Sequence, residues 1–147
     1  MKLMIDGDGC PVVDIAIRLC REFKVPCCLL CDTSHQFNRQ GAQTLVFDKG
    51  ADSVDFSLVN RLEPGDIVVT QDYGLASMCL ARKARPIHQD GWAYTEENID
   101  ALLFSRHQHR KLRNAGVRMK GPKKRSPQQD RDFDVFLRKL LQTAVQG

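Results

Sequence analysis

The chain has 147 residues, of which 42% are hydrophobic and 27% are charged. This length suits a single domain with its own core. Ten glycines and six prolines are too few for a collagen-like or low-complexity chain, and no apolar run approaches the length of about 18 residues that spans a membrane. Charge appears as early as Lys2 and Asp6, with no apolar secretion signal, so we expect a cytoplasmic protein.

The charge is divided unevenly along the chain, although its net value is only +4. Residues 106–125, here called the basic segment, contain nine of the 22 Lys and Arg residues and no Asp or Glu. The rest of the chain carries 13 basic and 18 acidic residues and is therefore net acidic. A solvated helix face usually mixes both signs, so this separation favours a functional role for the basic segment.

Short apolar segments alternate with segments whose apolar residues recur at helical spacing. The apolar segments predict strands at residues 3–5, 25–31, 44–47, 67–70 and 86–88. The amphipathic segments predict helices at residues 11–24, 52–62 and 73–83, with Pro11 as the first residue of its helix. Continuous apolar strands separated by helices are typical of a parallel sheet covered on both faces. We therefore expect an α/β fold with a doubly wound sheet of about four to five strands.

Two further helices follow the predicted sheet. Thr95 and the acidic residues after it favour one helix start. Ser126 and Pro127 favour another, for a helix at about 128–142. The basic segment lies between the two as a helix and loop. We expect residues 1–147 to form a single domain.

Aspartates follow three of the predicted strands. In a doubly wound sheet the carboxyl ends of these strands meet at one edge, where ligands bind. Crowded carboxylates repel one another unless a cation lies between them, and oxygen ligands suit Mg²⁺ or Mn²⁺. Such ions assist phosphodiester hydrolysis. The aspartates that we expect at this edge are Asp6, Asp8, Asp52, Asp55 and Asp72.

Two other interpretations of these aspartates stay open. Asp8, Asp52 and Asp72 each precede a predicted helix, where Asp is a common N-cap with no further role. Asp6 and Asp8 also resemble the nucleophile motif of haloacid-dehalogenase-type phosphatases, in which the first Asp attacks phosphorus. The residues that follow them depart from that motif.

The motifs around the aspartates resemble those of the YaiI/YqxD-type bacterial family. The matching segments extend over essentially the whole chain, and they are Met4–Pro11, Asp48–Asp52, Gly65–Ala76, Tyr94–Ile99, Lys120–Pro122 and Asp130–Arg131. The family looks like a branch of the PIN-like nuclease fold, a doubly wound domain that cuts RNA with metal-bound acids. The resemblance therefore implies a PIN-like fold.

The resemblance to PIN-like and related NYN domains also implies roles for individual residues. One Asp ends the first strand, as Asp6 does. A K-G-x-D segment opens a middle helix, like residues 49–52, and a T-x-D segment ends the fourth strand, like residues 70–72. The implied activity is that of a ribonuclease in which a metal-bound water attacks the phosphodiester. Its Mg²⁺ or Mn²⁺ would be held by Asp6, Asp8, Asp52 and Asp72 as the catalytic residues, with Lys49, Asp55 and Thr70 in support.

The basic segment suits contact with the phosphate backbone of RNA or another nucleic acid. Few aromatic residues lie near it in the sequence, so we expect little base stacking. A nucleic-acid-binding module without catalysis stays open as an alternative. The candidate nucleic-acid-binding residues are the nine cations of the segment: Arg106, Arg110, Lys111, Arg113, Arg118, Lys120, Lys123, Lys124 and Arg125.

Overall fold

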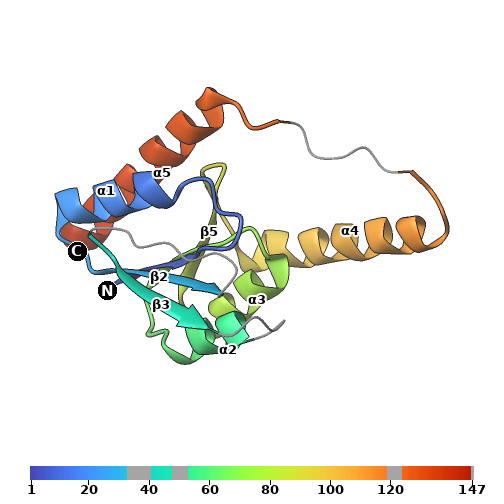
Figure 1. Cartoon of the computed structure of the whole chain (residues 1–147), viewed down its shortest axis with the longest axis horizontal. Helices are drawn as coiled ribbons and strands as arrows, with labels where there is room; N and C mark the ends of the chain where they lie inside the picture. Colours follow the sequence, from blue (N-terminus) through green and yellow to red (C-terminus); the bar gives the residue numbers. More distant parts are fainter. Residues whose placement is uncertain (33–40, 48–52, 119–123, 147) are drawn as a thin grey trace.

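The computed structural model describes residues 1–32, 41–47, 53–118 and 124–146. In these ranges, six strands form one sheet in the order β3-β2-β1-β4-β5-β6 (Figure 1). Neighbouring strands are parallel from β3 to β5, whereas β6 is antiparallel to β5. The predicted doubly wound α/β fold is confirmed. The strands are β1 (Leu3–Asp6), β2 (Cys27–Asp32), β3 (Gln43–Phe47), β4 (Ile67–Val69), β5 (Arg85–His88) and β6 (Trp92–Ala93).

The strand order reverses between β1 and β4. From β1 the chain moves outward to β2 and β3, and then it returns to the other side of β1 with β4 and β5. Asp6 ends β1 and Thr70 directly follows β4, so both lie at carboxyl ends of strands beside this reversal. Doubly wound sheets bind their ligands at this position.

Helices cover both faces of the sheet. The face that contains Leu3 and Ile5 packs against α1 and α5, whereas the face that contains Met4 packs against α2 and α3. Successive side chains of a strand point to opposite faces, which explains this alternation. The helices in the described ranges are α1 (Val13–Phe23), α2 (Ser53–Asn60), α3 (Tyr73–Ala81), α4 (Glu96–Asn114) and α5 (Pro127–Gln146).

Two details differ from the expectations above. The prediction that Pro11 begins a helix is wrong, because α1 begins at Val13 with Val12 as its N-cap. The chain first turns at Gly9, whose φ of +68° lies in the left-handed region that favours glycine. Strand β6 was not predicted, since two residues are too few to show an alternating pattern. Helix α5 does begin at Pro127, as its sequence predicts.

Helix α5 closes the α1 face of the sheet. Phe133, Leu137 and Leu141 are fully buried in the core cluster that also contains residues of β1 and α1. Ion pairs border this contact: the Arg18 guanidinium contacts Asp134, and Arg138 lies 2.7 Å from a carboxylate oxygen of Glu22. Because burial of large apolar side chains is worth about 2 kcal/mol each, the helix is an integral part of the core.

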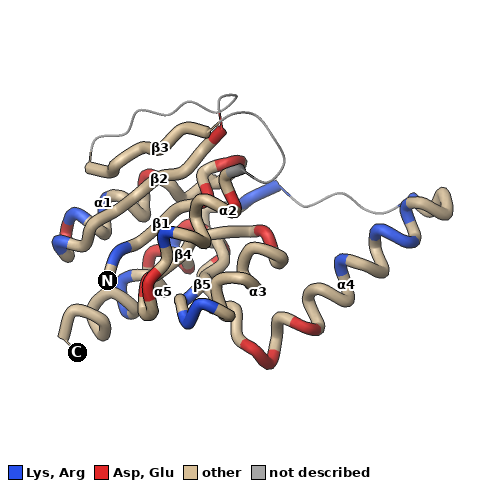
Figure 2. The backbone as a smooth tube through the Cα atoms, turned by 90° about the horizontal axis from the view of Figure 1, so that it is seen from below, with Lys and Arg blue, Asp and Glu red and all other residues tan. Residues whose placement is uncertain are grey.

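Helix α4 leaves the body of the molecule (Figures 1 and 2). It begins with a capping box, in which Thr95 Oγ1 accepts from the Asn98 N–H and the Asn98 side chain accepts from the Thr95 N–H. Ile99 is buried against α3, whereas Phe104 and nearly all residues after it are exposed. No helix in the described ranges is both long and apolar enough to cross a membrane.

Candidate carboxylate site

Thr70 connects the carboxyl ends of β1 and β4. Its hydroxyl donates a hydrogen bond to Asp6 Oδ2 at 3.0 Å and accepts one from the Asp72 backbone N–H at 3.0 Å. Its backbone carbonyl accepts a 3.0 Å hydrogen bond from the buried Tyr94 hydroxyl. Thr70 itself is only 2% exposed. These bonds fix the position of Asp6 relative to Asp72 at the reversal of strand order.

The Asp6 carboxyl lies in a partly buried and electronegative position. Burial raises its pKa, the Thr70 hydrogen bond opposes this, and the negative charges of Asp55, Asp8 and Asp72 add to the increase, so that the pKa is about 7. The charges of three carboxylates from other positions in the chain therefore act on the Asp6 carboxyl. A bound cation would relieve this repulsion.

Asp72 serves as the N-cap of α3. Its Oδ1 accepts hydrogen bonds from the backbone N–H groups of Gly74 at 2.9 Å and Leu75 at 3.3 Å, and the Arg106 guanidinium donates a third at 3.3 Å. Asp72 is therefore an N-cap, as one interpretation predicted. Asp8 is not, because the N-cap position of α1 is held by Val12, whose side chain makes no capping hydrogen bond. Asp72 can cap α3 and still belong to the carboxylate site, since the start of α3 and the end of β4 lie at the same edge of the sheet.

The turn after β1 carries Asp8 close to β2. The Asp32 backbone N–H lies 3.5 Å from Asp8 Oδ1, and the Gly7 N–H donates to the Leu30 carbonyl at 2.8 Å. A Cβ atom on Gly7 would lie 2.9 Å from that carbonyl oxygen and 2.7 Å from Leu29 Cδ1. Only glycine therefore permits this approach, which places Asp8 beside Asp6.

Part of the predicted site falls outside the described residues, namely Lys49 and Asp52. Within the described ranges, no group of three or more His, Cys, Asp or Glu side chains is arranged to hold a metal ion. The donor chemistry of Asp6, Asp8 and Asp72 fits a hard cation. These residues would need Asp52, water or a side-chain movement to complete the coordination.

The first cation of the basic segment lies at this edge. Arg106, with 43% of its side chain exposed, pairs with Asp72 although 34 residues separate them. The sequence predicted Arg106 as a nucleic-acid contact but not its contact with Asp72, because the packing of α4 on α3 is set by tertiary structure. Other described cations of the segment are exposed: Arg110, Lys111, Arg113, Arg118 and Lys124. Lys120 and Lys123 lie outside the described residues.

Arg125 ends the basic segment in a different environment. Its guanidinium donates to Asp90 Oδ1 and Asp130 Oδ1, both at 2.7 Å, and to the Gln89 carbonyl at 2.8 Å. Only 21% of its side chain is exposed. Arg125 thus joins the turn after β5 to the start of α5, which is a structural role.

We expect Arg125→Gln to destabilise the protein by about 2 kcal/mol, because charge-assisted hydrogen bonds are lost and two carboxylates keep no cation between them. Urea denaturation measures this loss. Lys124→Gln is the matched control, since it removes the same charge from an exposed neighbour and should leave the stability unchanged. Equal stabilities of the two variants would contradict the structural role.

An aromatic cluster, not foreseen from the sequence, borders the site. His88 and Trp92 stack with their ring centroids 4.5 Å apart, and Tyr94 packs edge-on against Trp92 at 4.7 Å. Tyr73, the residue after Asp72, contacts Tyr94 at 6.0 Å. Burial lowers the pKa of His88, although Asp90 opposes this shift. The cluster supports the hydrogen bond from Tyr94 to Thr70. The pairing of β5 with β6 places Trp92 opposite His88, and the start of α3 adds Tyr73.

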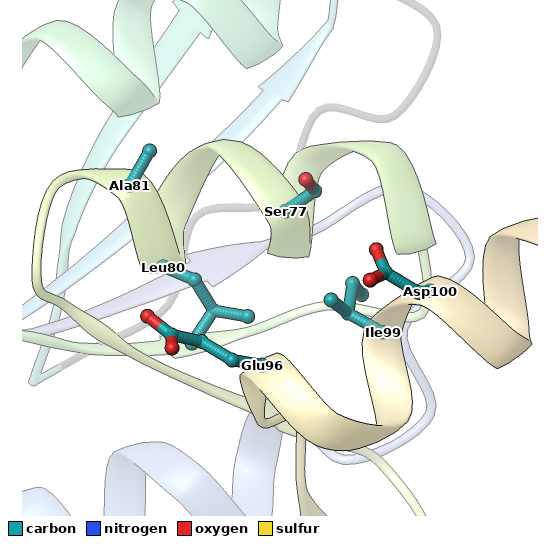
Figure 3. A pocket seen from close by; sticks show the side chains of 6 residues that line it. All are labelled: Ser77, Leu80, Ala81, Glu96, Ile99 and Asp100. Carbon is teal, nitrogen blue, oxygen red and sulfur yellow. The ribbon is translucent and has the colours of Figure 1, made fainter.

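A separate hollow of about 280 Å³ lies between α3 and the first turns of α4 (Figure 3). The side chains that line it are Ser77, Leu80, Ala81, Glu96, Ile99 and Asp100. None of the predicted site residues is among them. This hollow is therefore distinct from the carboxylate edge.

The fold and the site together define a class: a doubly wound α/β protein with carboxylates at the reversal of strand order. Residues 4–143 match the model of the family described as "Uncharacterized BCR, YaiI/YqxD family". The chain belongs to this family, as its motifs predicted. No solved structure matches it significantly.

Its relatives are similar over nearly their whole length. A UPF0178 protein of Exiguobacterium sibiricum is 57% identical over 141 residues, which cover 96% of each chain. A UPF0178 protein of Clostridium acetobutylicum is 46% identical over 143 residues, which cover 96% of this chain and 97% of the relative. A third, from Natranaerobius thermophilus, is 41% identical over 141 residues. The family assignment therefore applies to the whole domain.

Proposed function

We propose that this protein is a metal-dependent phosphodiesterase that acts on RNA. The observation that carries the proposal is the position of Asp6 at the reversal of strand order, where the negative charges of Asp8, Asp55 and Asp72 act on its carboxyl group. A fold needs no such repulsive cluster for its own stability. Perturbed carboxyl groups at a ligand-binding edge are typical of catalytic sites.

Asp6, Asp8 and Asp72, with Asp52, are the residues that would hold Mg²⁺ or Mn²⁺. When bound, such an ion activates a water for attack and stabilises charge on the phosphate oxygens. Asp6 binds a cation only in its ionised form, so its pKa of about 7 makes binding stronger as the pH rises through neutrality. The Thr70 hydroxyl orients Asp6, and Arg106 supplies positive charge beside Asp72 for a phosphate.

The observation that favours a second function is the ion pair between Arg106 and Asp72. It neutralises a carboxylate that the proposed cation would use. The same residues would then support a nucleic-acid-binding module, with Arg106 and the other exposed cations of the basic segment as phosphate contacts. Cleavage is the property that separates the two functions.

Asp72→Asn tests the proposed function. An amide oxygen can still cap α3, so the variant keeps its fold, but it lacks the negative charge that a cation needs. We expect Mn²⁺-dependent cleavage of single-stranded RNA to fall by at least about 100-fold, the scale of losing one electrostatic contact to a transition state. RNA binding should stay the same or improve, because a carboxylate that repels phosphate is gone.

The matched control is Asp100→Asn, which removes an exposed carboxylate that lines the hollow between α3 and α4, away from the carboxylate edge, and should cleave like the wild type. If the wild type cuts no RNA with Mn²⁺ but hydrolyses a small phosphomonoester, the protein is a phosphatase. If it does neither and still binds RNA with a steep salt dependence, it is a binding module. Either outcome would refute the proposed nuclease.

A further inference from the structure

One face of α4 changes from apolar to basic along its length. Ile99 is buried and Leu103 is partly buried against α3, and Arg106 reaches Asp72 on the same side. With 3.6 residues per turn, positions spaced alternately by four and three residues share a face. Arg110 and Arg113 continue this series. The face that joins α4 to the body therefore becomes a row of arginines where the helix leaves the body.

The opposite face of α4 has a different composition. Phe104 is 64% exposed, and Lys111 follows it by two helical turns. Lys111 is therefore a cation on the same stretch of helix that points away from the arginine row. The nine cations of the basic segment are thus not equivalent: three share the row, Lys111 lies opposite, and Arg125 is held by two carboxylates.

We propose that the arginine row is a track for the sugar-phosphate backbone of a single nucleic-acid strand, leading away from the carboxylate site. This inference rests on the proposed function for the chemistry at one end of the track. Arg106 contacts the phosphate beside Asp72, and Arg110 and Arg113 contact later phosphates of the same strand. The rise of 1.5 Å per residue places them about 6 Å and about 10 Å further along the helix.

The geometry of the row selects one strand over a duplex. The row lies on the part of α4 that leaves the body of the molecule (Figure 2), where its arginines are exposed. A duplex presents two phosphate strands, and a single row of cations can follow only one of them, so the row matches a single strand more completely. Arginine also suits the task, because its planar guanidinium can bind two phosphate oxygens at once.

The test measures binding by fluorescence anisotropy of labelled oligouridylates of about 2 and about 16 nucleotides, a dinucleotide and a length that fills a common single-strand site. EDTA prevents cleavage, and affinity is measured against KCl concentration. For the long probe, Arg110→Gln and Arg113→Gln should each make the log–log salt slope shallower by about 0.7, the value for one lost phosphate contact on a single strand. The short probe should show no such change in slope, because its single phosphodiester contacts one arginine at a time.

Lys111→Gln is the matched control, since it removes the same charge from the opposite face of the same helix. Its slope should equal that of the wild type. The proposed track would be overturned if Lys111→Gln and Arg110→Gln changed the salt slope equally. It would also be overturned if Arg110→Gln changed the slope equally for the short and the long probe. Cleavage by the wild type and its loss in Asp72→Asn are scored separately, so failure of the track and failure of the nuclease proposal are distinguishable.

Discussion

Asp6→Asn is expected to make the protein more stable at pH 8 while it abolishes metal-dependent cleavage. The Asp6 carboxyl has its pKa raised from 3.8 to about 7, primarily by burial, with further contributions from neighbouring negative charges. A shift of this size corresponds to about 4 kcal/mol. Because solvent partly reaches Asp6, we expect the substitution to recover only part of this energy. The free energy of unfolding should rise by about 2 kcal/mol, and the Tm by about 6 °C.

The sign follows from proton linkage. Between pH 4 and pH 7 the folded protein holds a proton on Asp6 that the unfolded chain has released. The free energy of unfolding of the wild type therefore falls as the pH rises through this range, and it levels off above the folded pKa. In Asp6→Asn this contribution is absent, since the amide does not titrate.

Asp66→Asn is the matched control, because it makes the same change at the other end of the sheet. Burial would raise the pKa of Asp66, but hydrogen bonds from Lys2 Nζ and from the backbone N–H groups of Glu63 and Lys2 outweigh it and hold the pKa below its ordinary value. This carboxylate therefore stabilises the fold above the unfolded pKa, and that stability is lost as the pH falls through the folded pKa. The substitution should cost about 2 kcal/mol at pH 8.

Urea denaturation from pH 4 to pH 8 compares these variants. Opposite signs for Asp6→Asn and Asp66→Asn at pH 8 are expected. Mn²⁺ should raise the Tm of the wild type at pH 8 and leave that of Asp6→Asn unchanged, because a ligand that binds only the folded state stabilises it. A loss of stability in Asp6→Asn at pH 8 would make Asp6 a structural carboxylate and remove the argument for a functional cluster.

Gly91→Ala is expected to destabilise the protein by about 4 kcal/mol. The residue has a φ of +90°, and a Cβ atom there would lie 2.7 Å from the Asp132 carbonyl oxygen and 3.0 Å from the Phe133 backbone nitrogen. Strain in a left-handed residue costs about 1–2 kcal/mol, and overpacking adds about 1–3 kcal/mol. Neither neighbour can move easily, because both are backbone atoms of α5 and Phe133 is fully buried.

Gly65→Ala separates the two contributions. Gly65 has a similar φ of +88° but no atom within 4 Å of the added Cβ position, so only the strain of about 1–2 kcal/mol is expected. Guanidinium denaturation of both variants gives the difference. If the two substitutions lower the free energy of unfolding equally, the close contact between the β5–β6 turn and α5 does not limit which residue can stand at position 91.

The strands and helices could be predicted because each carries its own local pattern. Leu3, Met4 and Ile5 are continuous apolar residues, which indicate a strand buried on both faces. Thr95 is a cap that is visible in the sequence. The start of α1 was misplaced because Pro11 suits the first turn of a helix as well as the turn before it, and Gly9 determines which applies.

For the site, the sequence could predict only that residues at the carboxyl ends of neighbouring strands lie near one another. The strand pattern predicted that Asp6 and Asp72 lie at one edge of the sheet, because the carboxyl ends of parallel strands meet there. The sequence does not indicate that Arg106 would reach Asp72 or that Arg125 would bind Asp90, since these contacts depend on the direction in which α4 leaves the body and on where α5 docks. Both arginines contribute one positive charge to the sequence, but the structure gives them different environments, because Arg125 is more buried than Arg106.

The packing of α5 on the first strand has a consequence for the folding pathway. The core cluster that contains Leu3 and Ile5 also contains Phe133, Leu137 and Leu141, which lie far from them in the sequence. Contacts between such distant residues form slowly, because the long intervening chain must first close into a loop. We therefore expect the docking of α5 beside α1 to be a late step in folding, and the part of the sheet that α5 covers to be exposed to aggregation until then.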